Sequence, residues 1–392
     1  MTRSTPADAA RRALLPAGLQ DVLASAAAQE AEVVRGLVAT CGAFGYERVE
    51  PPLLEFEDSL FAGPGAQVAD STFRLMDPLS QRMMGLRADI TPQVARIAAT
   101  RLGRAPRPLR LCYAGPVLRV RGSQLRPERQ VTQVGAELIG VDAEAADVEA
   151  VVVAAEALRA VGVARLSVDL SVPPLVGALC DALALPASLV AELRLALDRK
   201  DAAAVADLAA DHAGLFLTLM RAAGPAEAGI AALRRLDLPP AAAALTGRLE
   251  RVHAAIAESV PDLPLTVDPV EHRGFEYQTG LSFTFFARGV RGELGRGGRY
   301  ETPGLSGESE PATGFSLYMD VVLRALPPAT SPRKLYLPPG TAPAEAARLR
   351  GAGWATVSGF SSGAGPVAEA RRLGCSHRLQ QETIVPVEDE TP

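Results

Sequence analysis

Residues 272–300 read HRGFEYQTGLSFTFFARGVRGELGRGGRY, and a further apolar run, ATGFSLYMDV, follows at 312–321. Aromatic and other apolar residues make the centre of each run typical of a β-strand. The connections between the runs are short, whereas a parallel pair needs a crossover of a dozen or more residues, usually a helix. The stretch therefore predicts an antiparallel sheet, and the chain an α+β fold instead of a doubly wound parallel sheet.

The sequence before this stretch supplies further strands and helices of the same domain. Apolar residues at helical spacing predict long helices at 26–42 and 143–161. A shorter helix is predicted at 91–103, with Thr91 as its cap and Pro92 at its first position. The predicted strands are an edge strand at 46–55 containing two prolines, a hairpin at 71–78 and 81–90, and a pair at 107–120 and 130–141 joined by a polar loop.

Two changes in composition suggest the domain organisation. Residues from about 173 to 260 are alanine-rich and follow a helical pattern, which predicts a helical insertion. The proline-rich segment LPPATSPRK at 326–334 reads as a linker. We therefore expect a main domain at 1–330 that contains the insertion, followed by a small α/β module at 331–392.

Composition narrows the classes of function. The 392 residues are 48% hydrophobic and 22% charged, which is typical of a globular protein, and the net charge of −5 does not favour binding to tRNA or DNA. The four cysteines and four histidines are widely dispersed, so neither disulfides nor a metal site is expected. No long uncharged apolar run or signal segment is evident. These features predict a cytoplasmic protein without a cofactor.

Polar side chains interrupt the apolar strand at 130–141. Gln133 and Glu137 are four residues apart, so they share one face of the strand, and Arg119 ends the strand before it. If that face is buried, an amide and a carboxylate there need a ligand or neighbouring groups to satisfy them. The alternative is that the loop is a solvated hairpin tip and that Glu137 pairs with a surface arginine. The pattern alone leaves both interpretations open.

Two further segments combine glycine with polar or aromatic residues. Arg273, Tyr277 and Gln278 precede a strongly apolar strand, where Tyr277 could equally be a core aromatic residue with an anchored hydroxyl. GRGGRY at 295–300 allows a close backbone approach to a ligand, but it lacks the pattern of a phosphate loop. A glycine-rich β-turn is the alternative interpretation of that segment.

Taken in order, several segments resemble the catalytic domain of histidyl-tRNA synthetases, which are class II enzymes. The likeness covers roughly residues 15–326, and the pair RGFEYQTG with GGRY is fairly specific to the histidyl branch. The resemblance implies an antiparallel sheet flanked by helices, a dimer, and a pocket shaped for histidine. The segments are LLPAGLQDVL, GLRADITPQVAR, LRVRGSQ, RQVTQVGAE, RGFEYQTG, GRGGRY and ATGFSLYMDV.

The resemblance assigns roles to matching positions. Arg119 matches an arginine that grips the α-phosphate of ATP. Arg273 matches one that stabilises the reacting phosphate, and the resemblance also places it among the histidine-binding residues. Gln133 and Asp89 fall where the family contacts the α-amino and carboxylate groups of histidine, although glutamate is usual at Asp89. The remaining matches concern the imidazole: Glu137 and Tyr300 as its hydrogen-bond partners, and Tyr277 as the first of two tyrosines, of which the second is Gln278 here.

The chain departs from the synthetase pattern at the ATP site. Val321 stands where the family has an arginine that clamps the triphosphate, and Arg121 stands where it has a glutamate. A transition-state arginine contributes about 10³–10⁵ in rate, which corresponds to roughly 4–7 kcal/mol. With valine in its place, adenylation should be barely detectable. The segment after residue 334 is also too short for a full anticodon-binding domain.

This combination resembles the regulatory subunits of ATP phosphoribosyltransferase, which are paralogues of histidyl-tRNA synthetase. It implies a non-catalytic subunit that partners the short-form catalytic subunit at the first step of histidine biosynthesis. It also implies a dimer within a hetero-oligomer and feedback inhibition by L-histidine. Two alternatives stay open: a divergent histidyl-tRNA synthetase, and an amino-acid ligase that modifies a protein. The surface that contacts the catalytic subunit is not evident from the sequence.

Overall fold

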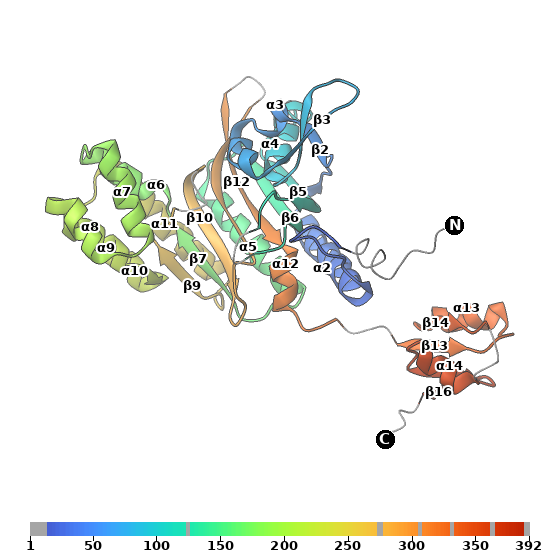
Figure 1. The fold of residues 1–392 in the computed structure, drawn as a ribbon. Coiled ribbons are helices and arrows are strands. Elements are labelled where there is room, and N and C mark those ends of the chain that lie inside the picture. Colours follow the sequence, from blue (N-terminus) through green and yellow to red (C-terminus); the bar gives the residue numbers. More distant parts are fainter. Residues whose placement is uncertain are drawn as a thin grey trace. The chain divides into compact units, whose positions relative to one another are not determined.

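The computed structural model describes residues 14–122, 126–272, 277–304, 308–329, 333–360 and 365–387. The chain divides into two compact units, Met1–Pro327 and Pro328–Pro392 (Figure 1). The first unit is built around a long sheet, and the second contains a separate small sheet.

In the described part of the first unit, nine strands form the long sheet. They are β1 (Glu47–Arg48), β5 (Leu109–Leu118), β6 (Gln130–Ile139), β7 (Leu166–Ser171), β8 (Gly224–Pro225), β9 (Leu265–Asp268), β10 (Gln278–Ala287), β11 (Gly295–Pro303) and β12 (Ser309–Tyr318). Their order is β1-β5-β6-β12-β11-β10-β7-β9-β8. All neighbours from β5 to β7 are antiparallel, and parallel pairs occur at β1·β5 and β7·β9. The predicted α+β fold with an antiparallel sheet is confirmed.

The segment GRGGRY lies within strand β11, so its interpretation as a β-turn is wrong. Gly297 pairs with Phe283 of β10 on one side and with Phe315 of β12 on the other. A Cβ atom at Gly297 would lie 2.1 Å from the carbonyl oxygen of Gly314 and 2.5 Å from the ring of Phe283. Glycine is therefore needed here because aromatic side chains from a neighbouring strand cover the backbone of β11.

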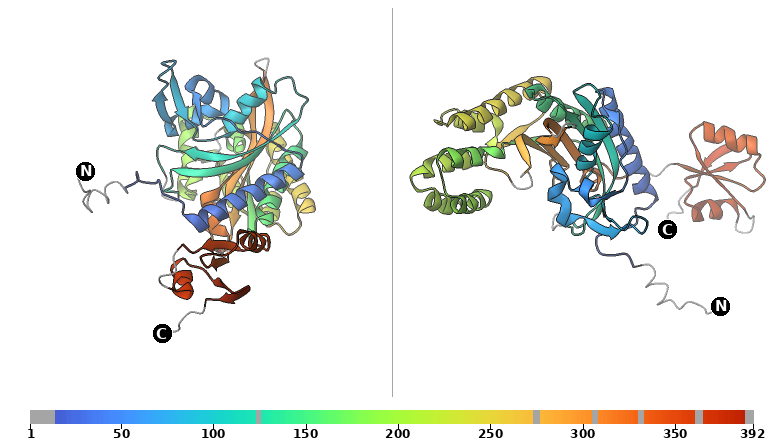
Figure 2. Two further views of the ribbon diagram at one scale, coloured as in Figure 1. Left: turned by 90° about the vertical axis from the view of Figure 1, so that its right-hand side faces the viewer. Right: turned by 90° about the horizontal axis from the view of Figure 1, so that it is seen from above.

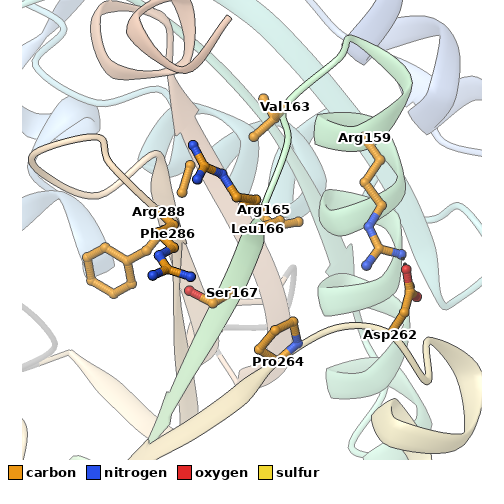
Figure 3. Close-up of a pocket in the computed structure, with 10 residues that line it drawn as sticks. Arg159, Val163, Arg165, Leu166, Ser167, Asp262, Pro264, Phe286 and Arg288 are labelled. Atoms are coloured by element: carbon orange, nitrogen blue, oxygen red, sulfur yellow. Dashed lines mark hydrogen bonds and ion pairs between the residues drawn. The ribbon is translucent and has the colours of Figure 1, made fainter.

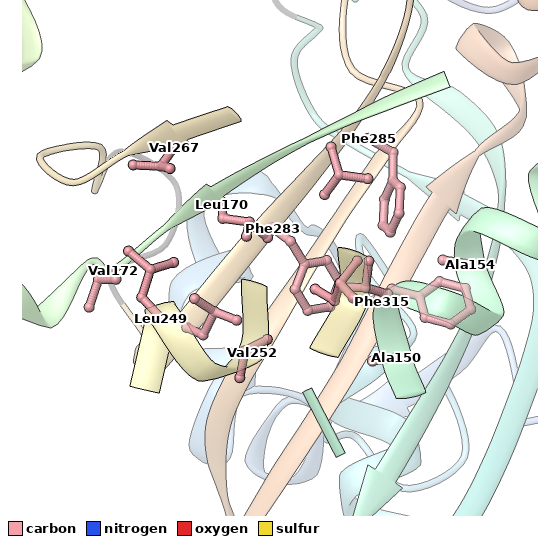
Figure 4. Packing of buried hydrophobic residues seen from close by; sticks show 14 of the residues in the cluster. Ala150, Ala154, Leu170, Val172, Leu249, Val252, Val267, Phe283, Phe285 and Phe315 are labelled. Carbon is pink, nitrogen blue, oxygen red and sulfur yellow. The ribbon is translucent and has the colours of Figure 1, made fainter. Parts of the chain in front are cut away.

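Three helices cover one face of the sheet and enclose the main core: α2 (Ala24–Ala43), α5 (Glu144–Ala160) and α11 (Pro240–Ser259). Phenylalanines on β10 and β12 pack toward these helices, and the small side chains of α5 leave room for their rings (Figure 4). The helices predicted at 26–42 and 143–161 correspond to α2 and α5. The residues drawn include Ala150, Ala154, Leu170, Leu249, Val252, Phe283, Phe285 and Phe315.

The other face carries helix α4 (Thr91–Thr100) and a three-stranded sheet of β2 (Leu54–Phe56), β4 (Met83–Leu86) and β3 (Phe73–Met76). The hairpin predicted at 71–78 and 81–90 is confirmed by the antiparallel pairing of β3 with β4. The single edge strand predicted at 46–55 is wrong. Pro51 and Pro52 separate β1, at the edge of the long sheet, from β2 in the small one.

A buried charge network ties α5 and α11 to the sheet. The carboxylate of Asp147, which is fully buried, accepts hydrogen bonds from Arg299 Nε and Thr313 Oγ1 through Oδ1, each at 3.0 Å. Its Oδ2 accepts one from Arg248 Nε at 2.9 Å. Arg299 also donates to the carbonyl oxygens of Val141 and Ala143. The Asp147 carboxylate thus joins two arginines that come from different elements, Arg299 of β11 and Arg248 of α11.

The predicted insertion consists of α6 (Pro174–Ala182), α7 (Ala187–Asp198), α8 (Ala202–Ala209), α9 (Ala213–Arg221), α10 (Ala226–Leu233) and α11, with the two-residue strand β8 between α9 and α10. These helices extend from the β9 end of the sheet (Figure 2). Among the described helical segments, 202–221 is long and apolar enough to cross a membrane by composition. It forms two short helices, however, which are separated by a 3₁₀ turn at Ala210–His212 and pack against each other.

The second unit is a small α/β fold. Its strands are β13 (Lys334–Leu337), β14 (Ala355–Ser358), β15 (His377–Gln380) and β16 (Thr383–Pro386), in the order β14-β13-β15-β16. Helices α13 (Pro343–Gly351) and α14 (Pro366–Arg372) accompany them. Leu335 and Leu337 pack with Leu349 of α13, whereas Tyr336 packs with Ala370 of α14, so alternate β13 residues serve two small cores.

Candidate functional site

The candidate site lies on the face of the long sheet that carries α4. On β6, Val134 and Ala136 belong to the main core, whereas Val131 and Ile139 pack with the residues of α4. Because alternate residues of a strand face opposite ways, Gln133 and Glu137 lie on the α4 side. Both are buried, with exposed fractions of 0% and 1%. The interpretation of Glu137 as a surface residue paired with an arginine is therefore wrong.

Three hydroxyl groups surround the Glu137 carboxyl group. Thr91 and Tyr113 each donate a hydrogen bond to Oε1 at 3.1 Å, and Tyr300 donates one to Oε2 at 2.8 Å. Gly314 lies opposite on β12, and a Cβ atom there would lie 1.8 Å from Oε2. Burial raises the pKa of Glu137 to about 8, against the lowering effect of these hydrogen bonds. A ligand proton or charge placed beside this carboxyl group would therefore shift its protonation near neutral pH.

Gln133 connects this carboxyl group to the N-terminal end of α4. Its Oε1 accepts a hydrogen bond from the backbone N–H of Ile90 at 3.0 Å. Its Nε2 donates to Asp89 Oδ1 at 2.9 Å and to Ser316 Oγ at 2.7 Å. Asp89 Oδ1 also accepts a hydrogen bond from the backbone N–H of Thr91 at 2.8 Å. The structure therefore brings together three residues singled out from the sequence, Asp89, Gln133 and Glu137.

Aromatic and amide side chains from β10 and β11 close the site. The rings of Tyr277 and Tyr300 make an edge-to-face contact with centroids 6.0 Å apart. Gln278 is buried, and its Oε1 has no hydrogen-bond partner among the described residues. That oxygen lies against Gly298, where a Cβ atom would be 2.4 Å away. The space left between these side chains amounts to about 10 Å³, roughly the space of one water molecule.

Arg119 and Val321, which the resemblance assigned to the phosphate site, lie near the ends of β5 and β12. The guanidinium of Arg119 lies 5.2 Å, and that of Arg126 4.4 Å, from the ring centroid of Tyr318. Val321, in the short helix α12 (Met319–Val322), is fully buried in the main core. Its neighbour Asp320 is half-buried, and burial raises the pKa of its carboxyl group. Arg273 lies outside the described residues.

Three residues with hydroxyl groups belong to the site although the sequence did not predict them as site residues. Thr91 was predicted to cap α4, but its hydroxyl donates to Glu137 instead, and Asp89 accepts from the first turn of the helix. Tyr113 and Ser316, whose oxygens lie 3.0 Å apart, bridge Glu137 to Gln133. The signal available in the sequence is that both residues interrupt apolar strands next to small residues, in LCYAG and GFSLY.

The raised pKa of Glu137 predicts a specific pH dependence of stability. Between pH 4.5, its ordinary pKa, and about 8, the folded state keeps a proton that the unfolded state releases. Stability therefore falls as pH rises through this window, by up to about 1.4 kcal/mol per unit. Glu137→Gln removes this contribution, so its advantage over the wild type should grow from pH 5 to 8 and then level off. Urea unfolding of both proteins at pH 5–9 tests this, and parallel curves would contradict it.

The sequence is similar to a known protein family and to curated relatives. A family model described as histidyl-tRNA synthetase matches residues 18–322. An ATP phosphoribosyltransferase regulatory subunit from Rhodospirillum centenum is 55% identical over 377 residues, which cover 96% of this chain and 97% of the relative.

Solved structures agree on the fold. A Bacillus halodurans protein described as an ATP phosphoribosyltransferase regulatory subunit/histidyl-tRNA synthetase has a TM-score of 0.80 at 22% identity, covering 92% of this chain and 96% of its own. A chain of an ATP phosphoribosyl transferase complex from Thermotoga maritima has a TM-score of 0.59 at 18% identity, covering 74% of this chain and 97% of its own. With 55% identity along nearly its whole length to a curated relative, the chain belongs to the family of ATP phosphoribosyltransferase regulatory subunits.

Proposed function

We propose that this chain is a non-catalytic subunit that activates the short-form catalytic subunit of ATP phosphoribosyltransferase and makes it sensitive to L-histidine. The effector would bind at the Glu137 site, and two copies of the chain would pair within a cytoplasmic hetero-oligomer. The observation that carries the proposal is a contrast between the residues that match the histidine pocket of a synthetase and those that match its ATP site. Three hydroxyl groups hydrogen-bond the Glu137 carboxyl group, whereas the position that matches the triphosphate clamp is occupied by the buried Val321.

The absence of a positive charge at position 321, where valine stands, argues against adenylation. A synthetase must neutralise the charge that develops on the reacting phosphate, and an arginine at this position would supply part of that neutralisation. Here the side chain at this position packs in the apolar core. The adjacent carboxyl group of Asp320 has a pKa that burial raises, while Arg126 lowers it and Glu128 raises it. Without a cation at position 321, weak or absent ATP use is the expected behaviour.

The Glu137 site has the chemistry to recognise an imidazole. A buried carboxyl group with a pKa of about 8 can accept a hydrogen bond from an imidazole N–H as a carboxylate, or donate one to the other ring nitrogen as an acid. Asp89, beside Gln133, offers an anionic group to an α-ammonium. Because the site encloses only about 10 Å³, histidine would bind a conformation in which Tyr277 or Gln278 has moved. Such a difference between two states is what feedback inhibition requires.

The assay that tests the proposal is phosphoribosyl-ATP formation by the cognate short-form catalytic subunit. Adding this chain is expected to raise the rate of phosphoribosyl-ATP formation. L-histidine is expected to lower that rate, with a coupling of about 5–150-fold between histidine binding and the active state. Co-elution of the two subunits would be measured in parallel. A well-folded chain that co-elutes with the catalytic subunit but leaves its rate unchanged would overturn the activating role.

The alternative of a divergent synthetase, or of another amino-acid ligase, has a separate test. Both activities begin by forming an aminoacyl adenylate, which exchanges pyrophosphate into ATP. We expect no histidine-dependent exchange above background at ordinary enzyme concentrations, because the buried Val321 supplies no positive charge. Clear exchange would contradict the non-catalytic assignment even if the chain also activated its partner.

A further inference from the structure

A cavity of about 700 Å³ lies where the start of β7, the end of β10 and the turn before β9 meet the C-terminal end of α5. Its polar lining includes Arg159, Arg165, Ser167, Asp262 and Arg288, and the ring of Phe286 lies at one edge, beside Arg288 (Figure 3). None of its lining residues belongs to the cavity at Glu137. Its volume falls in the range of roughly 300–1,000 Å³ that is typical of small-molecule sites.

The cavity is positively charged, although the chain as a whole carries a net charge of −5. Among the described residues that line it, three are arginines and Asp262 alone is acidic. Asp262 is already paired with Arg159 at 3.1 Å. Figure 3 places this pair apart from Arg165 and Arg288. Among the described residues, no carboxylate forms an ion pair with Arg165 or Arg288, so two guanidinium groups remain available to an anion.

The backbone holds these two arginines next to each other. The backbone N–H of Arg288 donates a hydrogen bond to the carbonyl oxygen of Arg165 at 3.1 Å. Arg165 has a φ of 51°, a left-handed conformation that residues other than glycine rarely adopt. A strained backbone that carries a charged side chain at the mouth of a cavity is a reason to look for a function there.

An apolar surface accompanies the charges. Phe286 is paired with Ser167 across β10 and β7, and its side chain is 37% exposed, whereas Phe283 and Phe285 on the same strand are buried. An exposed aromatic ring beside arginines is suited to stack on a planar ring while the guanidinium groups bind its anionic substituent.

We propose that this cavity binds a small phosphomonoester that carries a planar ring, of the nucleoside monophosphate class. Arg165 and Arg288 bind the phosphate, Ser167 donates a further hydrogen bond, and Phe286 stacks on the ring. The site is separate from the Glu137 pocket and does not depend on the function proposed for that pocket.

The test is calorimetric titration of the full-length chain with adenosine 5′-monophosphate, with adenosine and inorganic phosphate as partial probes. We expect the monophosphate to bind more tightly than either partial probe. The double variant Arg165→Asn/Arg288→Gln should weaken its binding about 10-fold or more. Asparagine tolerates the left-handed backbone of position 165, so this variant should fold normally. Arg221→Gln, which alters an exposed arginine at the end of α9, is the matched control and should bind as the wild type does.

Four results would overturn the proposal. The first is equal binding by the double variant and the wild type, and the second is equal binding of adenosine and its monophosphate. The third is loss of binding in Arg119→Gln, which would place the nucleotide beside Tyr318. The fourth is no binding of the monophosphate at all; if the double variant then also fails to assemble with the catalytic subunit, the arginines serve a protein interface.

Discussion

Asp147→Ala is expected to lower the free energy of unfolding of the first unit by about 3–5 kcal/mol. The substitution removes the carboxylate that Arg299, Arg248 and Thr313 share. Arg299 is itself nearly fully buried, with a side chain 5% exposed, so its charge would stay in the protein interior without this partner. Urea unfolding monitored by far-ultraviolet circular dichroism measures the loss.

Asp142 provides a matched control, because its carboxylate contacts the same two arginines from an exposed position. It lies 3.1 Å from Arg248 and from Arg299, and its side chain is 64% exposed. Exposed ion pairs contribute about 0–1 kcal/mol, so Asp142→Ala should be nearly neutral. Equal destabilisation by the two substitutions would show that the burial of Asp147 does not determine how much the network contributes to the free energy of unfolding.

The antiparallel sheet could be predicted from sequence because its signal is local. The strands at 278–303 are rich in aromatic residues and glycines and are joined by a short connection, and the structure pairs them as β10 and β11. The prediction failed where tertiary contacts decide the outcome. Thr91 has the pattern of a helix cap, but its hydroxyl donates a hydrogen bond to the buried Glu137 carboxyl group on the strand that faces α4.

The site residues that the sequence did not predict also depend on tertiary contacts. Tyr113 and Ser316 are hydrogen-bonded although 203 positions separate them, because β6 places β5 and β12 on its two sides. No local pattern encodes that strand order. The arginine-lined cavity was missed for the same reason, since Arg165, Asp262 and Arg288 come from three distant segments. By contrast, the resemblance to synthetases identified Asp89, Gln133, Glu137 and Tyr300, which the structure brings into one cluster.

Glu137→Ala is expected to weaken L-histidine binding by about 10- to 150-fold, which corresponds to the roughly 1.5–3 kcal/mol of a hydrogen bond that involves a charged group. In the proposed complex the Glu137 carboxyl group is the partner of the imidazole, and no other carboxylate is among the described residues that line this cavity. Tyr300→Phe removes one of the three hydroxyls that position Glu137 and should have a smaller effect of the same sign. Calorimetric titration of the isolated chain with histidine measures both.

Assembly separates a lost ligand contact from a damaged fold. Glu137 is buried on β6, so its replacement should leave the surface that meets the catalytic subunit unchanged. Each variant should therefore still activate phosphoribosyl-ATP formation while histidine inhibits it less. Glu156→Ala, which alters an exposed glutamate on α5, should behave as the wild type does in both assays. If Glu137→Ala and Tyr300→Phe both keep full histidine sensitivity, the effector binds elsewhere, and the enclosed space at Glu137 is a structural remnant of a synthetase ancestor.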